Sequence, residues 1–269
     1  MNGILNPAVL VLGASGQVGS GVVSALLEAG CPVIGVARDP DRLSRLARAH
    51  ADEPGLEAMQ ASVADDAASA ELALRLQGRP LRAIVACLAG PLERGRLLDR
   101  PVVCLQRVLE ENLLPHLAAA RHLLPLLADS HRTGSAGGQG GVVAHYLLVG
   151  ATGAEQGWAG YGEISIAAAA QAMLAKVLHG EAAALGVRLQ MLSLDHPLCD
   201  PLDAKRNCAR WPTALSVGRR VVAMLTCDQK VTPVVRFSAP WAPPPVATFY
   251  PLRSAEPGDS LNAFPGLPG

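Results

Sequence analysis

The sequence has little charge and no excess of either sign. Lys and Arg together number 23, as do Asp and Glu, and charged residues make up only 17% of the 269 residues. Because no basic block is present, neither a nucleic acid nor an anionic membrane surface is expected as a partner. No apolar run approaches the ~18 residues that a membrane-spanning helix needs. The composition therefore favours a small molecule as the ligand.

The sequence also lacks the paired spacings of cysteine and histidine that hold metal ions. Its six cysteines include no Cys-x-x-Cys pair, and its seven histidines are not joined by cysteines or acids at ligand spacing. No basic and hydrophobic leader of the kind that directs secretion precedes Val9. We therefore expect a reduced, cytoplasmic protein without a metal site.

What the sequence does contain is a glycine-rich turn close to its N-terminus. Four apolar residues from Val9 lead into Gly13, Gly16 and Gly19, and a helical pattern of apolar residues follows. The apolar run is typical of a buried parallel strand, and the glycines would allow a diphosphate to approach the N-terminus of the next helix. An ordinary strand-to-helix turn is the alternative, so the rest of the chain must decide.

Strands and helices are expected to alternate along the chain up to residue 238. Short apolar runs indicate strands at 9–12, 31–37, 56–63, 81–90, 142–149, 187–194 and 232–238, with helical patterns between them. Because parallel strands need covering crossovers, we predict a single-domain α/β Rossmann fold over residues 1–238, with a doubly wound parallel sheet of about seven strands. Residues 239–269 are expected to form a proline-rich C-terminal arm.

Three further segments carry structural expectations. The pattern from 102 to 127 predicts a long helix with Pro115 in its interior, so a kink is expected near Asn112. A second long helix, rich in alanine, is expected over 161–185. A polar, glycine-rich stretch at 133–141 predicts a surface loop.

The residue after the second expected strand bears on the choice of cofactor. In a βαβ unit this position lies near the adenosine ribose, where an acid favours the ribose hydroxyls. Here it is Arg38, followed by Asp39, and a guanidinium offers a planar set of donors to a 2′-phosphate. The sequence therefore favours NADP(H) over NAD(H). A surface ion pair between Arg38 and Asp39 or Asp41 is the alternative.

The order of elements and several motifs resemble the short-chain dehydrogenase/reductase family over about residues 8–238. Gly13 and Gly19 fit the glycine turn of that family, and Gly16 falls one position early, as in its atypical and extended branches. Ser62 stands where the family has an adenine-contacting aspartate, and Ala89-Gly90 retains half of its Asn-Asn-Ala-Gly turn. The resemblance implies a dinucleotide site formed by Gly13, Ser15, Gly16, Gln17, Val18, Gly19, Arg38, Ser62, Val63, Ala89 and Gly90.

The same resemblance implies a catalytic tyrosine in an incomplete setting. Tyr161 matches the family's proton donor, and Asn112 matches the helix asparagine that holds a water in a proton relay. The family's Tyr-x-x-x-Lys motif has Ser165 at the lysine position, and its catalytic serine falls at Gly150, with Thr152 as the nearest hydroxyl. The implied activity is reduction of a carbonyl, on a ketone or a 3-oxoacyl-type substrate, by NADP(H).

Each candidate catalytic residue also has a structural interpretation. Ser165 lies one helical turn from Tyr161 and could hydrogen-bond a ribose hydroxyl, but it carries no positive charge. Tyr161 could be a packed tyrosine, Asn112 could cap carbonyls freed by Pro115, and Thr152 could satisfy its own loop. The rival function is therefore a catalytically impaired protein that binds dinucleotide as a sensor or a partner subunit.

Three residues in the later loops also have both a functional and a structural interpretation. His196 could donate a proton near the nicotinamide or be an ordinary loop histidine. Trp158 and Trp211 could wall a substrate pocket or pack in the core. The family resemblance also implies a homodimer or homotetramer, in which the helices at 102–127 and 161–185 pair across a two-fold axis. A third function left open is an assembly protein whose proline-rich arm recruits partners.

Overall fold

A seven-stranded parallel sheet forms the centre of the molecule. The computed structural model describes residues 7–91, 93–134, 143–150, 157, 159–199, 211–226 and 232–238. The strand order is β3-β2-β1-β4-β5-β6-β7, so the order reverses between β1 and β4. This confirms the predicted Rossmann fold. The strands are β1 (Ala8–Leu12), β2 (Val33–Ala37), β3 (Leu56–Gln60), β4 (Leu81–Ala86), β5 (Ala144–Gly150), β6 (Val187–Leu194) and β7 (Val234–Phe237).

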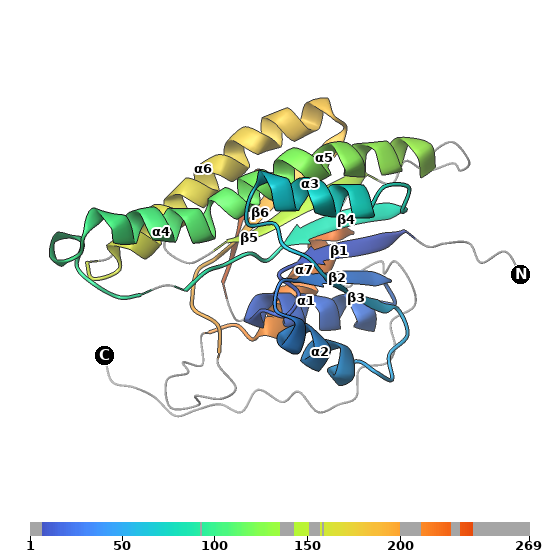
Figure 1. Ribbon diagram of the computed structural model, residues 1–269, viewed down its shortest axis with the longest axis horizontal. Coiled ribbons are helices and arrows are strands. Elements are labelled where there is room, and N and C mark those ends of the chain that lie inside the picture. Colours follow the sequence, from blue (N-terminus) through green and yellow to red (C-terminus); the bar gives the residue numbers. More distant parts are fainter. Residues whose placement is uncertain are drawn as a thin grey trace, which may run out of the picture.

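Helices cover both faces of this sheet (Figure 1). One face carries α1 (Gln17–Glu28), α2 (Pro40–Ala49) and α7 (Ala214–Leu225), and the other carries α3 (Asp66–Arg75), α5 (Leu114–Gly134) and α6 (Gly162–Ala184). Successive side chains of a strand point to opposite faces, so Val9 and Val11 pack in one core while Leu10 and Leu12 pack in the other. Burial on both faces explains why the inner strands read as uninterrupted apolar runs.

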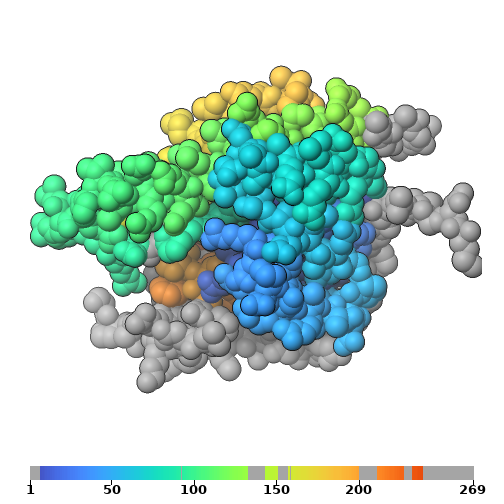
Figure 2. Space-filling model, in the orientation of Figure 1, coloured from blue at the N-terminus to red at the C-terminus, as the bar shows by residue number. Residues whose placement is uncertain are grey.

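The long helix expected over 102–127 is two helices. α4 (Val102–Asn112) follows a short 3₁₀ turn, η1 (Leu97–Asp99), and Leu113 separates it from α5, which continues to Gly134. Pro115 has no N–H for the carbonyl of Glu111, and the N–H of His116 bonds the carbonyl of Leu113. The helical ladder is therefore broken at the predicted place, and α4 extends away from the sheet (Figures 1 and 2).

The helices α1 and α7 touch through their backbones. A Cβ added at Gly21 would overlap main-chain atoms of Ala214, and one added at Gly218 would overlap the main-chain oxygen of Gly21. An ion pair between Arg219 and Glu28, at 3.2 Å, lies beside this contact. The two helices form one closely packed layer beneath the glycine turn.

Some predictions fall outside the described residues. The glycine-rich stretch is described only up to Gly134 and the proline-rich arm not at all, so both stay predictions. In the part of the chain that the structure describes, no helix is long and apolar enough to span a membrane.

Candidate functional site

The glycine turn joins β1 to α1 at the carboxyl edge of the sheet, where the strand order reverses. Gly13 has φ +73°, which side-chain-bearing residues rarely adopt, and a Cβ there would overlap the main-chain oxygen of Cys87. Gly16 is the N-cap of α1, and no side chain caps the first turn of that helix. The N–H groups of Gln17, Val18 and Gly19 therefore lack intrahelical partners, as a diphosphate site requires.

Two arginines lie where β2 ends, beside this turn. Arg38 is exposed and forms no ion pair with any residue that the structure describes, so the predicted alternative of a pair with Asp39 or Asp41 is not seen there. The Arg42 guanidinium donates to the main-chain oxygen of Ser15 at 3.1 Å. The Asp39 carboxylate instead caps α2, and its hydrogen bond from the N–H of Arg42 lowers its pKa. The acid is committed to the helix, while the Arg38 guanidinium is available for an anion.

A small hollow of about 240 Å³ continues from Arg38 toward the ends of β3 and α3. Arg38, Gln60 and Ser62 line it, together with Glu71 and Arg75 of α3. The Ser62 hydroxyl accepts a hydrogen bond from the N–H of Ala64 at 3.1 Å, which shapes the turn after β3. Val63 beside it is buried. The predicted contacts for adenosine are therefore brought together at one edge of the sheet, beside the glycine turn.

Residues at the break between α4 and α5 hold the turn after β4 by hydrogen bonds. The N–H of Gly90 donates to Oδ1 of Asn112 at 2.9 Å, and Nδ2 of Asn112 donates to the carbonyl of Val108. Asn112 is only 3% exposed. The Gln171 amide of α6 donates to the main-chain carbonyl of Asn112. The side chain of Asn112 thus fastens the Gly90 turn, which differs from the predicted alternative, because the Val108 carbonyl that it bonds is not one freed by Pro115.

His116 holds the same turn from the first turn of α5. Its Nε2 lies 2.9 Å from the carbonyl of Leu88, and a carbonyl only accepts, so this nitrogen is the donor. Burial lowers the pKa of His116 to about 4, so the ring is neutral near pH 7. Its Nδ1 finds no hydrogen-bond partner among the described residues.

Tyr161 is the N-cap of α6, at the edge where β4 and β5 end. The Arg94 guanidinium lies over its ring, 5.1 Å from the centroid, and the N–H of Gly95 donates to the carbonyl of Gly160 at 2.8 Å. Ser165 follows one turn later on α6 and is buried. The N–H of Ser165 donates to the carbonyl of Tyr161 at 2.9 Å, so the two residues stand one helical turn apart, and Arg94 adds a cation on the tyrosine face.

A buried ion pair beside Tyr161 was missed by sequence reasoning. Glu163 is 2% exposed, and its Oε1 accepts from Nε of Arg100 at 2.9 Å. Arg100 also donates to Glu93 at 2.8 Å, so both acids are committed to one guanidinium. This pair joins the segment after β4 to the start of α6. Only the acid in the first turn of α6 hinted at it, because Arg100 lies far away in the sequence.

The position of the family's catalytic serine is closed by a neighbouring strand. A Cβ added at Gly150, the last residue of β5, would overlap Cε of Met191 and lie 3.3 Å from Oε1 of Gln171. Met191 is a fully buried residue of β6, paired in register beside β5. A serine could occupy position 150 only if the Met191 side chain moved.

The remaining candidates are separated from these groups or lie outside the described residues. Thr152 and Trp158 belong to the latter. Trp211 is half-buried, and its main-chain oxygen accepts from the Cys199 thiol at 3.1 Å. The Gln17 amide donates to the carbonyl of Cys199 at 2.9 Å, which ties the turn to this segment. Within the described ranges no cluster of metal-ligating side chains occurs.

Comparison with known proteins agrees with this geometry. A family model described as NAD(P)H-binding matches residues 13–123. A short-chain type dehydrogenase/reductase from Mycobacterium ulcerans has a TM-score of 0.73 and 17% identity, over 86% of this chain and 87% of that one. A short-chain dehydrogenase from Streptomyces avermitilis has a TM-score of 0.68 and 18% identity, over 86% and 88%. A metagenomic short-chain oxidoreductase solved with NADP has a TM-score of 0.69 and 17% identity, over 87% and 97%. No curated protein matches the sequence.

At these identities the solved structures establish the fold, and the family model adds the nicotinamide dinucleotide as ligand of the N-terminal half. The expected resemblance is thereby confirmed at both points. Residues 13–123 thus match an NAD(P)H-binding family, and the chain has the fold of the short-chain dehydrogenase/reductase structures.

Proposed function

We propose that the chain binds NADP(H) and reduces the carbonyl group of a small substrate. The observation that carries the proposal is the uncapped first turn of α1 beside Arg38. A guanidinium with no ion-pair partner among the described residues, next to a diphosphate site, suits the 2′-phosphate that distinguishes NADP from NAD. The short-chain oxidoreductase solved with NADP, cited above, has the same fold and supports this choice.

Tyr161 is the proposed proton donor. Bound NADPH would supply the hydride. The Tyr161 hydroxyl is a hydrogen-bond donor that can pass its proton to the carbonyl oxygen as the hydride arrives. Ser165, which stands at the lysine position, can offer only a hydrogen bond. The proposed activity therefore runs as reduction, on a ketone or a 3-oxoacyl-type compound.

The test titrates the protein with NADPH and NADH by fluorescence, and then measures NADPH oxidation with a panel of ketones and 3-oxoacyl thioesters. Tyr161→Phe should lower kcat by about 100-fold or more and leave NADPH affinity unchanged. Tyr146→Phe is the matched control, because Tyr146 is buried within β5 and its hydroxyl has no partner among the described residues. Absence of binding to either nucleotide would refute the proposal.

The second candidate is a dinucleotide-binding protein without turnover. Met191 beside position 150 and Ser165 in the place of a lysine favour it. The first leaves no hydroxyl there to orient the carbonyl oxygen, and the second removes a positive charge from the neighbourhood of the tyrosine. The two functions separate in the same experiment. NADPH binding without oxidation on any carbonyl of the panel would support the second candidate and reject the first.

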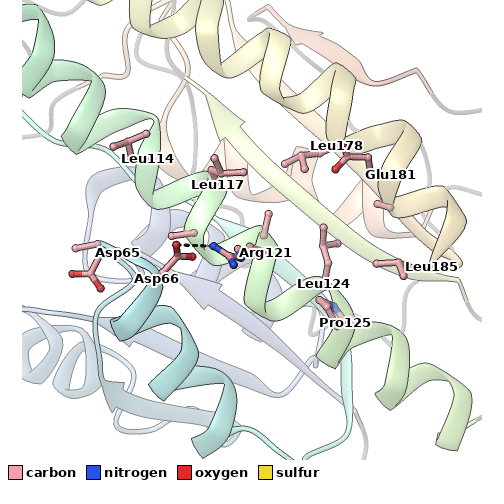
Figure 3. Close-up of a pocket in the computed structure, with 14 residues that line it drawn as sticks. Asp65, Asp66, Leu114, Leu117, Arg121, Leu124, Pro125, Leu178, Glu181 and Leu185 are labelled. Atoms are coloured by element: carbon pink, nitrogen blue, oxygen red, sulfur yellow. Dashed lines mark hydrogen bonds and ion pairs between the residues drawn. The ribbon is translucent and has the colours of Figure 1, made fainter.

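We also propose that the chain forms a homodimer through α5 and α6. On α6, Met173 is 58% exposed and Val177 is 52% exposed. Between the helices lies a hollow of about 500 Å³, and Figure 3 shows leucines of α5 and α6 around it, with Asp66 paired to Arg121. The leucines that line it are Leu114, Leu117, Leu124, Leu178 and Leu185. An apolar surface of this kind is typical of subunit contacts.

A further inference from the structure

Gln171 lies behind the site and connects three elements that meet there. It belongs to α6, and its amide donates to the main-chain carbonyl of Asn112 at the end of α4. Its Oε1 lies beside Gly150 at the end of β5. We infer that Gln171 is a positioning residue that holds the Gly90 turn in the shape that receives the nicotinamide half of the dinucleotide. This inference rests on the proposed binding of NADP(H).

The need for Gln171 follows from the break at Pro115. The carbonyl of Asn112 would bond the N–H of His116 in a continuous helix, but that N–H bonds the carbonyl of Leu113 at 3.1 Å. The Asn112 carbonyl is therefore released from the helix inside the protein, where an unsatisfied acceptor is costly. Gln171, which is 4% exposed, supplies the donor from the neighbouring helix.

From Asn112 the connection continues to the turn. The carbonyl of Asn112 is fixed by Gln171, and its side chain bonds both the N–H of Gly90 and the carbonyl of Val108 at 2.9 Å. Without Gln171 the last turn of α4 would lose its anchor, and the Asn112 side chain would no longer face Gly90 in one orientation. The effect of Gln171 would thus reach the turn through Asn112.

The position of the Gly90 turn limits the expected effect of Gln171 to one half of the dinucleotide. Gly90 follows β4, on the opposite side of the strand reversal from Arg38, which follows β2. A dinucleotide lies across that reversal, so its adenosine half meets the Arg38 side and its nicotinamide half meets the Gly90 side. Gln171 should therefore govern the binding of NADPH but not that of adenosine 2′,5′-bisphosphate, which lacks the nicotinamide half.

The experiment measures both ligands on the Gln171→Leu variant by isothermal titration calorimetry. The expected result is an NADPH affinity about tenfold weaker, with the affinity for adenosine 2′,5′-bisphosphate changed by less than about twofold. Gln190→Leu is the matched control. Gln190 is also a buried glutamine whose amide donates to a main-chain carbonyl, that of Thr232 at 2.8 Å, but it lies at β6 and β7. Its loss should leave the ratio of the two affinities unchanged.

A second measurement does not depend on nucleotide. Hydrogen exchange of the peptide that contains Gly90 should be about tenfold faster or more in Gln171→Leu than in Gln190→Leu. Unchanged exchange at Gly90, or NADPH and adenosine 2′,5′-bisphosphate weakened by equal factors, would overturn the inference. If the wild-type protein bound neither ligand, the proposed function would fall, and the exchange measurement would still decide whether Gln171 holds the turn.

Discussion

Introducing a serine at position 150 tests whether the Met191 side chain excludes a side chain from that position. In Gly150→Ser the new Cβ overlaps Cε of Met191, whose side chain is fully buried in the core. Overpacking of this kind costs about 1–3 kcal/mol, and the serine regains part of it because glycine in a strand is unfavourable by about 0.5–1 kcal/mol. We expect a net loss of about 1–2 kcal/mol in the free energy of unfolding.

The assay is a double-mutant cycle followed by urea unfolding. Met191→Ala alone should cost about 2–4 kcal/mol because it leaves a cavity. In the double variant the serine enters that cavity. Its loss in the free energy of unfolding should therefore be at least about 1 kcal/mol smaller than the sum of the losses in the two single variants. Gly150→Ala serves as control and should behave like Gly150→Ser, since the Cβ itself makes the overlap. Losses that add within about 0.5 kcal/mol would refute the reasoning.

Three other predictions concern separate parts of the molecule. Arg38→Ser should weaken NADPH binding at least about tenfold and leave NADH binding unchanged in fluorescence titrations, and equal weakening of both would contradict the assignment of Arg38 to the 2′-phosphate. His116 has a pKa of about 4 when folded and about 6.5 when unfolded, so the unfolded state gains a proton first as pH falls from 6.5 to 4. Between pH 7 and pH 5, the free energy of unfolding measured in urea should fall by about 2 kcal/mol less in His116→Leu than in the wild type. An equal fall in both proteins would contradict the lowered pKa of His116. Met173→Glu should convert the proposed homodimer to a monomer in light scattering, and an unchanged mass would exclude the exposed face of α6 as the interface.

The sheet and the glycine turn were predictable because their signals are local. A strand buried on both faces must be apolar throughout, and Gly13 is required by a positive φ within the turn itself. The break near Asn112 was also predictable from Pro115, since a missing N–H acts on the helix that contains it. What the pattern did not give was the outcome of the break, two helices with Leu113 between them.

The overlap at position 150, where the resembled family has its serine, could not be predicted from the sequence. The absence of the lysine at Ser165 is visible in the sequence, but the overlap of Met191 with position 150 depends on the register of β6 beside β5. The bond from Gln171 to Asn112 likewise joins residues 59 positions apart, on helices that only the fold brings together. Contacts of this kind leave no periodic trace, because any buried position can hold a methionine or a glutamine.

The contact between α1 and α7 couples the glycine turn to a second helix. Backbone touches backbone at Gly21 and Gly218, with no side chain between to absorb a displacement. Backbones packed this closely resist displacement relative to one another, and the Gln17 amide also donates to the carbonyl of Cys199, after β6. A ligand that binds the first turn of α1 stabilises the whole unit by RT ln(1 + [L]/Kd). Occupancy of the turn is thus thermodynamically linked to the packing of α7 and to the hydrogen bond at Cys199.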